Sequence, residues 1–185
     1  VFEMNKLAYI LMISGDSTDS FLVGKMAALQ VQGLFVAYKE RFDKDNFIKN
    51  LLLDNLLLVD IYNRAKKLHI DTEVRRVIFI VEMKHEKDSN TIDNVRTLLG
   101  GKTKDFVTAV DEHSIILVKE LKEKESAEEI DRIAKTIEET LNAETNSHVY
   151  ISSGTIVSDL KDVSRSYKEA KMALDVGKIF YVEKN

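Results

Sequence analysis

The sequence predicts an α+β protein in which a long N-terminal helix leads into a domain of mixed helices and strands. The stretch from about residue 19 to residue 53 contains no proline and only two isolated glycines, which predicts one long helix. From residue 75 onward, short apolar runs alternate with amphipathic stretches, and the apolar runs predict strands. Their order along the chain is β-α-β-β-α-β, followed by a further helix and a short strand.

The composition is that of a soluble protein without a basic field for nucleic acid. The chain has 185 residues, of which 44% are hydrophobic and 31% charged, and its net charge is −4. The absence of cysteine excludes disulfides and fits a reducing cytoplasm. No run approaches the roughly 18 uninterrupted apolar residues of a membrane helix, and no signal peptide pattern is present. We therefore expect a cytoplasmic protein that does not enter a membrane. Because the chain begins with Val1, we also expect a piece of a longer protein.

The predicted N-terminal helix carries an apolar seam. Residues 6–14 before it predict a short strand that ends at the turn signal Gly15-Asp16. In the helix, aromatic and small apolar residues recur every seven positions, an a/d pattern over about three heptads. This pattern is typical of a coiled-coil dimer, but it also fits an amphipathic helix that packs on a neighbouring domain, and both readings stay open. The seam residues expected in a homodimer are Phe21, Ala28, Val31, Phe35, Tyr38 and Phe42.

Three elements are predicted between the long helix and the second half of the chain. Residues 55–70 predict a second helix with one apolar stripe. Residues 75–83 contain five consecutive apolar residues, which predicts a central strand that is buried on both faces. Residues 89–101 predict a short helix that ends in two glycines. The stripe of the second helix consists of Leu58, Ile61, Ala65 and Leu68.

Six further elements are predicted in the second half. Ser126 and Glu129 form a capping box for one helix, and Ser158 caps the last helix, which ends at Gly177. Together with the central strand, these elements predict a ferredoxin-like core, an antiparallel sheet with helices on one face. In chain order they are strands over 105–110 and 114–120, a helix over 126–144, a strand over 148–154, a helix over 158–177 and a strand over 178–183.

The triplet Asp111-Glu112-His113 lies between two predicted strands and raises the question of a metal site. Side chains of neighbouring strand residues point to opposite faces, so three adjacent residues cannot converge on one ion. Polar residues between two apolar runs are also typical of a tight turn, and we favour the turn. The weak metal candidates are Glu82, Asp111 and Glu112, and we predict neither a metal nor another cofactor.

No arrangement of catalytic residues is visible. The stretch "SSGT" at residues 152–155 lacks the flanking glycines of a nucleophile elbow. Arg96 stands where a phosphate-binding loop ending in residues 101–103 would need a glycine. His85 and Glu86 lack the histidine pair of a zinc helix. The residues alone therefore predict no catalytic group.

The stretch "RSYKEAKMALDVGK" at residues 165–178 follows "VYISSGTIVSDLKDVS" at residues 149–164. Together with a second segment over residues 46–71, it resembles the sugar-diacid and purine-catabolism transcriptional regulators of the CdaR/PucR type. In that family, a strand that ends in small residues and glycine precedes a helix that reads roughly L-x-x-x-S-Y-x-E-A-x-x-A-L. Residues 46–71 also resemble the connector helices of the family, with a Leu-Leu run and the pair Arg64-Ala65. The resemblance covers roughly residues 44–182. The residues that fit the helix pattern are Leu160, Ser166, Tyr167, Glu169, Ala170, Ala173 and Leu174.

The resemblance implies a middle domain similar to the GGDEF fold of diguanylate cyclases. In an active cyclase the Gly-Gly-Asp/Glu-Glu-Phe signature occupies the hairpin between two central strands. The matching hairpin at residues 110–114 lacks both glycines, and the first core strand offers only Glu82 in place of a metal-binding Asp. Phosphoryl transfer needs carboxylates and a metal to activate the attacking hydroxyl. We therefore expect a chain that is not an enzyme. The alternative is a nucleotide-binding or residual cyclase-like domain in which Glu82, Asp111 and Glu112 still hold a metal.

The resemblance also implies an order of parts. Residues 1–15 would be the C-terminal strand of a truncated sensory domain, residues 16–71 connector and signalling helices, and residues 72–185 the GGDEF-like regulatory domain. A small-molecule effector would bind the sensory part, and DNA would bind a C-terminal helix-turn-helix, both outside these 185 residues. The sequence does not identify ligand-binding residues, the effector or the target genes. A plain interaction domain without a regulatory role is a third reading.

Overall fold

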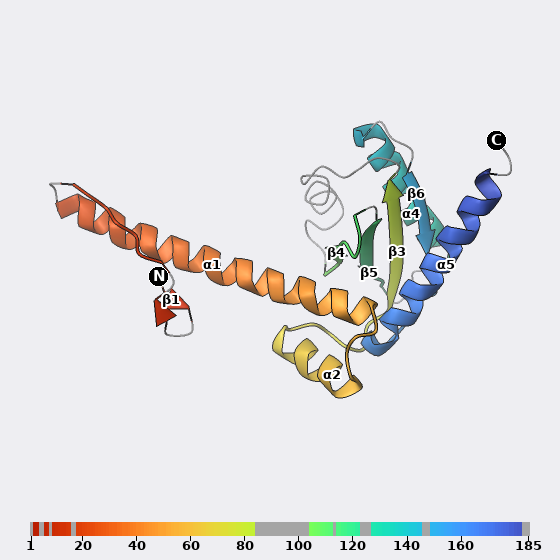
Figure 1. The fold of residues 1–185 in the computed structure, drawn as a ribbon, viewed down its shortest axis with the longest axis horizontal. Coiled ribbons are helices and arrows are strands. Elements are labelled where there is room, and N and C mark those ends of the chain that lie inside the picture. Colours follow the sequence, from red (N-terminus) through yellow and green to blue (C-terminus); the bar gives the residue numbers. More distant parts are fainter. Residues whose placement is uncertain are drawn as a thin grey trace. The chain divides into compact units, whose positions relative to one another are not determined.

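The computed structural model describes residues 2–3, 6–7, 9–15, 18–83, 104–112, 114–122, 127–145 and 149–182 (Figure 1). Its contacts divide the chain into two compact units, Val1–Lys44 and Asp45–Asn185. The division falls within helix α1 (Thr18–Leu52), so most of this helix belongs to the first unit and its last two turns to the second. The predicted helix over 89–101 and the residues His85, Glu86, Arg96, His113, Ser126 and His148 lie outside the described residues.

The first unit combines a short strand pair with most of α1. Strands β1 (Phe2–Glu3) and β2 (Lys6–Leu7) are antiparallel. Residues 9–15 are neither helix nor strand, so the prediction of a strand over 6–14 is wrong beyond Leu7. Alternating apolar residues make a strand only where a second strand pairs with them, and none pairs with residues 9–15 in the described part of the chain. The predicted long helix is confirmed.

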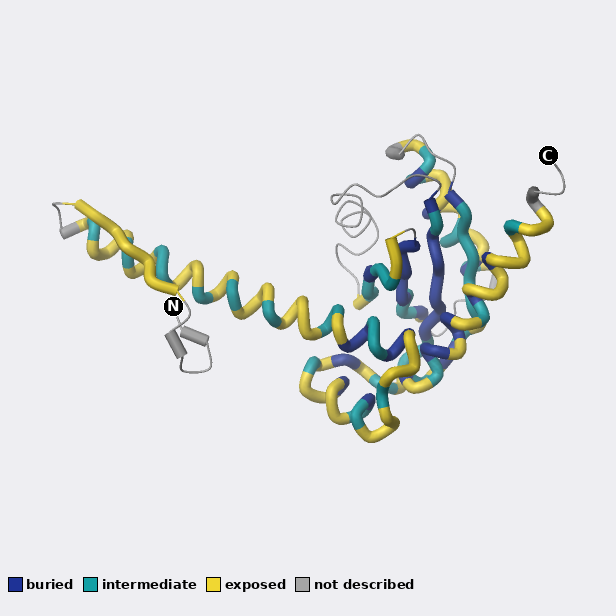
Figure 2. Tube along the Cα trace, in the orientation of Figure 1, coloured by how far each residue is buried: buried dark blue, intermediate teal, exposed yellow. Residues whose placement is uncertain are grey.

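The second unit is built on a four-stranded antiparallel sheet. Its strands are β3 (Arg76–Met83), β4 (Phe106–Thr108), β5 (Ser114–Glu120) and β6 (Val149–Ser153). They lie in the order β4-β5-β3-β6, and every neighbouring pair is antiparallel. The predicted central strand is confirmed, since Val77 to Val81 are all buried (Figure 2). The fold is therefore α+β, while the ferredoxin-like topology stays a prediction because residues 84–103 lie outside the described part.

Helices pack on both faces of this sheet. The expectation that the two helices of the ferredoxin-like core share one face stays a prediction, because the first of them, over 89–101, lies outside the described residues. One face contacts α4 (Ala127–Thr145), whose Ile130, Ile137 and Leu141 are buried against β3 and β5. The other face contacts α5 (Val163–Val182), α2 (Leu58–Lys67) and the carboxyl end of α1. A strand with apolar residues at every position supplies a core to both faces, and each face needs its own cover. The helix residues buried on the second face are Phe47, Ile48, Leu51, Leu52, Ile61, Ala65, Leu160, Val163, Tyr167, Ala170 and Leu174.

The end of the chain differs from the prediction. The 3₁₀ turn η1 (Leu160–Asp162) precedes α5, and Asp159, not Ser158, is its cap, because the Asp159 side chain accepts a hydrogen bond from the Lys161 N–H. Helix α5 continues through Gly177 to Val182, so the predicted strand over 178–183 is wrong. Gly177 does not adopt a positive φ and therefore does not form a helix-ending turn. A glycine costs a helix only about 1 kcal/mol, which neighbouring turns can absorb.

Candidate functional site

The acidic residues named in the sequence lie at one end of the β3–β5 pair. Glu82 on β3 is directly opposite Ser114 on β5 in the strand register. The Ser114 N–H donates to Oδ1 of Asp111 at 2.6 Å, so Asp111 closes the loop of the β4–β5 hairpin. The structure therefore brings Glu82 and Asp111 to the same end of the sheet. Glu112 is exposed on the loop.

The carboxylate of Glu82 has a basic partner. Lys178 of α5 donates its Nζ hydrogen to Oε2 of Glu82 and forms an ion pair with it. Both side chains are largely covered, with 34% and 23% of their surfaces exposed. A divalent cation that used Glu82 would have to displace this ammonium group. No pattern in the sequence indicates this contact, since 96 residues separate the two partners.

Asp111 acts electrostatically on Tyr167 of α5. Burial raises the pKa of the Tyr167 hydroxyl on α5, and the negative charge of Asp111 raises it further. Asp111 thus accepts the hydrogen bond that shapes the turn and also affects Tyr167. Among the residues that the structure describes, no group of three or more metal-ligating side chains comes together.

The residues of the family-like pattern join α5 to β6, and we call this set of contacts the α5 lock. Ser166 is fully buried, and its hydroxyl donates to the Thr155 carbonyl at 2.7 Å. The Thr155 N–H donates to Oε2 of Glu169 at 3.1 Å, and the Thr155 hydroxyl donates to the same oxygen. These bonds keep the pKa of Glu169 below its usual value. The stretch after β6 therefore serves as a docking turn for α5.

Glycine is required at the centre of the lock. A Cβ on Gly154 would lie 2.0 Å from the Ser166 carbonyl oxygen and 2.5 Å from its hydroxyl oxygen. Backbone of β6 and α5 can approach this closely only because Gly154 has no side chain. A second bond follows one turn later, where the Ser152 hydroxyl donates to the Ala170 carbonyl at 2.8 Å. The close packing of β6 against α5 thus explains the small residues before the helix.

Two polar contacts tie the connector segment to η1 and α5. Lys168 of α5 forms an ion pair with Asp54 at 2.6 Å, just after α1 ends. Asp54 has a φ of 61°, a left-handed conformation that Asp tolerates better than most residues. The Tyr62 hydroxyl on α2 is within 3.0 Å of both carboxylate oxygens of Asp159, and its bond to them raises the pKa of Tyr62.

A buried arginine holds the segment between α2 and β3. The Arg76 side chain is 2% exposed, and its Nη2 donates to the Asp71 carbonyl at 2.6 Å. The nearest carboxylate, on Glu120, lies 3.8 Å away, and burial lowers the pKa of Arg76. Because the strongest contact is a backbone carbonyl, Arg76 fixes the course of the chain as it enters β3. We assign it a structural role.

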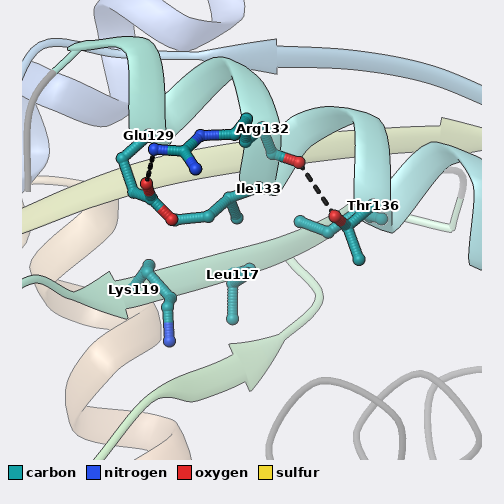
Figure 3. A pocket seen from close by; sticks show the side chains of 7 residues that line it. Leu117, Lys119, Glu129, Arg132, Ile133 and Thr136 are labelled. Atoms are coloured by element: carbon teal, nitrogen blue, oxygen red, sulfur yellow. Dashed lines mark hydrogen bonds and ion pairs between the residues drawn. The ribbon is translucent and has the colours of Figure 1, made fainter.

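A shallow cavity of about 240 Å³ lies between β5 and α4 (Figure 3). Arg132 forms an ion pair with Glu129 on the same helix, and Lys119 forms one with Asp105 at 2.6 Å. Both cations therefore already have carboxylate partners, and the cavity is smaller than most small-molecule sites. Its lining consists of Leu117, Lys119, Glu129, Arg132, Ile133, Thr136 and Ile137.

Comparison with known proteins identifies one family. The family model described as a GGDEF-like domain (GGDEF_2) matches residues 55–176, which is more than half of the 185 residues. The match begins just before α2 and ends within α5, so it includes the β3 end, the hairpin and the α5 lock. No curated protein and no solved structure matches the chain.

Proposed function

Because the chain belongs to the family of GGDEF-like domains, we propose that it is a non-enzymatic signalling segment of a cytoplasmic transcriptional regulator of the CdaR/PucR type. The DNA-binding helix-turn-helix and the sensory part that binds a small-molecule effector would lie outside these 185 residues. The family-like pattern on α5 and the connector before β3 support this proposal.

The observation that carries the proposal is the ion pair between Glu82 and Lys178. A cyclase-type reaction needs a divalent cation held by carboxylates near the end of the first core strand. Here Lys178 already pairs with the carboxylate of Glu82, the residue that the resemblance offers in place of the metal-binding Asp. The hairpin loop also lacks the two glycines that would let a nucleotide approach the backbone.

The connector contacts support a signalling role. Asp54, before α2, forms an ion pair with Lys168 of α5. Tyr62, in α2, donates a hydrogen bond to Asp159 at the cap of η1. A movement of the last turn of α1 would therefore act directly on α5. In the proposed regulator, α5 is the last described element before the DNA-binding part.

GTP turnover with Mg²⁺ tests the proposal. We expect the purified chain to release neither pyrophosphate nor a cyclic dinucleotide, and Lys178→Ala to stay inactive because the hairpin glycines are absent. Turnover by the unaltered chain that disappears in Glu82→Gln would overturn the proposal. In the parent gene, a helix-turn-helix with a basic recognition helix beyond Asn185 would support it, and a different output module would contradict it.

The second candidate is a domain that binds a nucleotide with a metal. The observation that favours it is the placement of Glu82 and Asp111 at one end of the β3–β5 pair. Under this candidate, calorimetry with GTP or cyclic di-GMP and Mg²⁺ would give heat that Glu82→Gln and Asp111→Asn both abolish. Glu112→Gln serves as the matched control, because Glu112 lies exposed on the same loop.

A further inference from the structure

Helix α5 has a buried first part and an exposed last part. In the first part, one face is buried in the core, where Ala170 and Leu174 are 0% and 6% exposed. In the last part, the side chains of residues 175–180 are exposed, up to 63% at Phe180, with one exception (Figure 2). The exception is Lys178, whose side chain is 34% exposed. Among the side chains that the structure describes, Lys178 is therefore the single anchor of the last turns of α5.

Lys178 stands where the buried face of α5 would continue. Ala170, Leu174 and Lys178 follow one another at intervals of four residues, so they lie on the same side of the helix. The Lys178 Nζ donates a hydrogen bond to Oε2 of Glu82 on β3 and forms an ion pair with it. The last turns are thus anchored by a charged contact in place of an apolar one, and such a contact can break without disturbing the core.

The local sequence makes the last turns depend on this contact. Gly177 lies directly before Lys178 inside the helix, and glycine weakens a helix interior more than any residue except proline. A Cβ at Gly177 would have no atom within 4 Å, so packing does not require a glycine there. Helix ends open first, and a partly exposed ion pair adds only a small stabilisation. The held and released forms of residues 175–182 should therefore differ little in free energy.

Glu82 lies at the end of the sheet that carries the β4–β5 hairpin loop. In the strand register it is opposite Ser114 on β5 and Tyr150 on β6. The Ser114 N–H donates to Asp111 of the loop. The ion pair with Lys178 thus connects the last turns of α5 with the loop end of the sheet. A change at this end that draws Glu82 away from Lys178 would act on α5.

Helix α1 has an exposed part of a different kind. In the described part of the chain, Asp19–Leu52 is the one helix long and apolar enough to cross a membrane, contrary to the expectation from uninterrupted runs. Helices of soluble proteins can share this property. Its first part exposes large apolar side chains from Phe21 at 77% to Tyr38 at 71%, and it contacts residues 9–15 at two separate positions. Loss of one of these contacts would leave the other in place.

We propose that Lys178 and Glu82 form a latch. While they are paired, the last turns of α5 stay against the sheet, and when they separate, residues 175–182 are released. Another cation that occupies the Glu82 carboxylate competes with Lys178 and opens the latch. What the released turns do rests on the proposed function, in which α5 is the last described element before the DNA-binding part.

Hydrogen–deuterium exchange of the full chain tests the latch. The amides of residues 178–182 should exchange at least about threefold faster in Lys178→Met and in Glu82→Gln, the factor expected when a partly exposed ion pair is lost. Lys178→Met keeps the length of the side chain and removes its charge. Lys168→Met is the matched control, because it breaks the ion pair with Asp54 that the same helix forms earlier. In this control the exchange of residues 178–182 should not change.

Two further measurements distinguish a latch from a general loss of stability. The double variant Glu82→Lys with Lys178→Glu restores an ion pair with reversed charges, so the slow exchange of residues 178–182 should return. In the unaltered chain, raising NaCl from about 0.05 M to about 1 M should speed the exchange of these residues, because salt screens partly exposed charges. In Lys178→Met the same change of salt should have no such effect.

Three results would overturn the latch. They are unchanged exchange in Lys178→Met, an equal rise in Lys168→Met, and a rise that covers residues 163–174 as much as residues 178–182. The third result would mean that the whole of α5 loosens. Each of them differs from the result that overturns the proposed function, which is GTP turnover by the unaltered chain.

Discussion

Helix α1 contains two apolar regions with opposite environments. Near its carboxyl end, in the second unit, Phe47, Ile48 and Leu52 are at most 2% exposed. In its first part, in the first unit, Leu29 and Leu34 are 69% and 71% exposed. Apolar content is similar in both regions, so composition alone does not distinguish a helix face that is buried in a core from one that is exposed.

The difference between the regions comes from contacts that are remote in sequence. The carboxyl end of α1 packs in one cluster with Ile78 and Ile80 of β3 and with Leu160 and Val163 at the start of α5. In the first part of α1, Phe35 packs with Tyr9 and Gly24 lies beside Ile13. Stability should therefore depend strongly on the second unit and weakly on the first. Substitutions in the two units test this difference in stability, and substitutions within the second unit show which of its contacts contribute most.

Gly154→Ala should have the largest effect. Its Cβ would meet backbone of α5 at 2.0 Å, so β6 and α5 would have to separate. We expect a loss of more than about 4 kcal/mol in the free energy of unfolding, measured with urea. The control is Gly33→Ala, where nothing lies within 4 Å and helix propensity predicts a gain of up to about 1 kcal/mol. Similar losses in both variants would contradict the proposed role of the α5 lock.

Leu52→Ala and Leu34→Ala compare the two regions of α1 with one substitution. Leu52 is fully buried, and its truncation should cost about 3 kcal/mol. Leu34 is exposed, so its truncation should change the unfolding free energy by less than about 0.5 kcal/mol. Thermal or urea unfolding measures both. A large effect at Leu34 would show that the first part of α1 has a core contact.

Glu169→Gln should have a pH-dependent effect. The bonds from Thr155 lower the pKa of Glu169 below its usual value of 4.5. A lowered pKa adds stability above the unfolded pKa, and this stability is lost as the pH falls through the folded pKa. The free energies of unfolding of the unaltered chain and of Glu169→Gln should therefore differ by about 1 kcal/mol at pH 7 and converge in acid. A difference that does not change with pH would contradict the ionised bond to Thr155.

Tyr62→Phe should have the smallest effect. It removes the hydroxyl that bonds to Asp159 and keeps the ring, so we expect a loss of stability smaller than that of Glu169→Gln. Because the pKa of Tyr62 is raised, the contribution is present below the unfolded pKa and lost as the pH rises through the folded value. Urea unfolding at pH 7 and in alkali measures this. Unchanged stability of Tyr62→Phe at pH 7 would show that the bond between Tyr62 and Asp159 does not stabilise the packing of α2 against η1.

The elements with strong local patterns could be predicted from the sequence. Three elements were predicted from local patterns and are present in the structure. They are strand β3, from its apolar run, helix α1, from its heptads and the lack of helix-breaking residues, and helix α4, from its apolar stripe. Errors occurred where a local pattern needed a distant partner. Residues 9–14 look like a strand but have no strand beside them in the described part of the chain, and residues 178–182 look like a strand but continue a helix.

By itself, the sequence determined the α+β class, the core strands and the position of Asp111 in a hairpin loop, because these depend on residue spacing within a few turns or strands. Only the tertiary structure decided that Lys178 pairs with Glu82, that Gly154 admits the backbone of α5, and that Leu29 and Leu34 of α1 remain exposed within one chain. These contacts join residues that are far apart in sequence or depend on the packing of whole elements. Side-chain type restricts such contacts, but the fold alone brings the partners together.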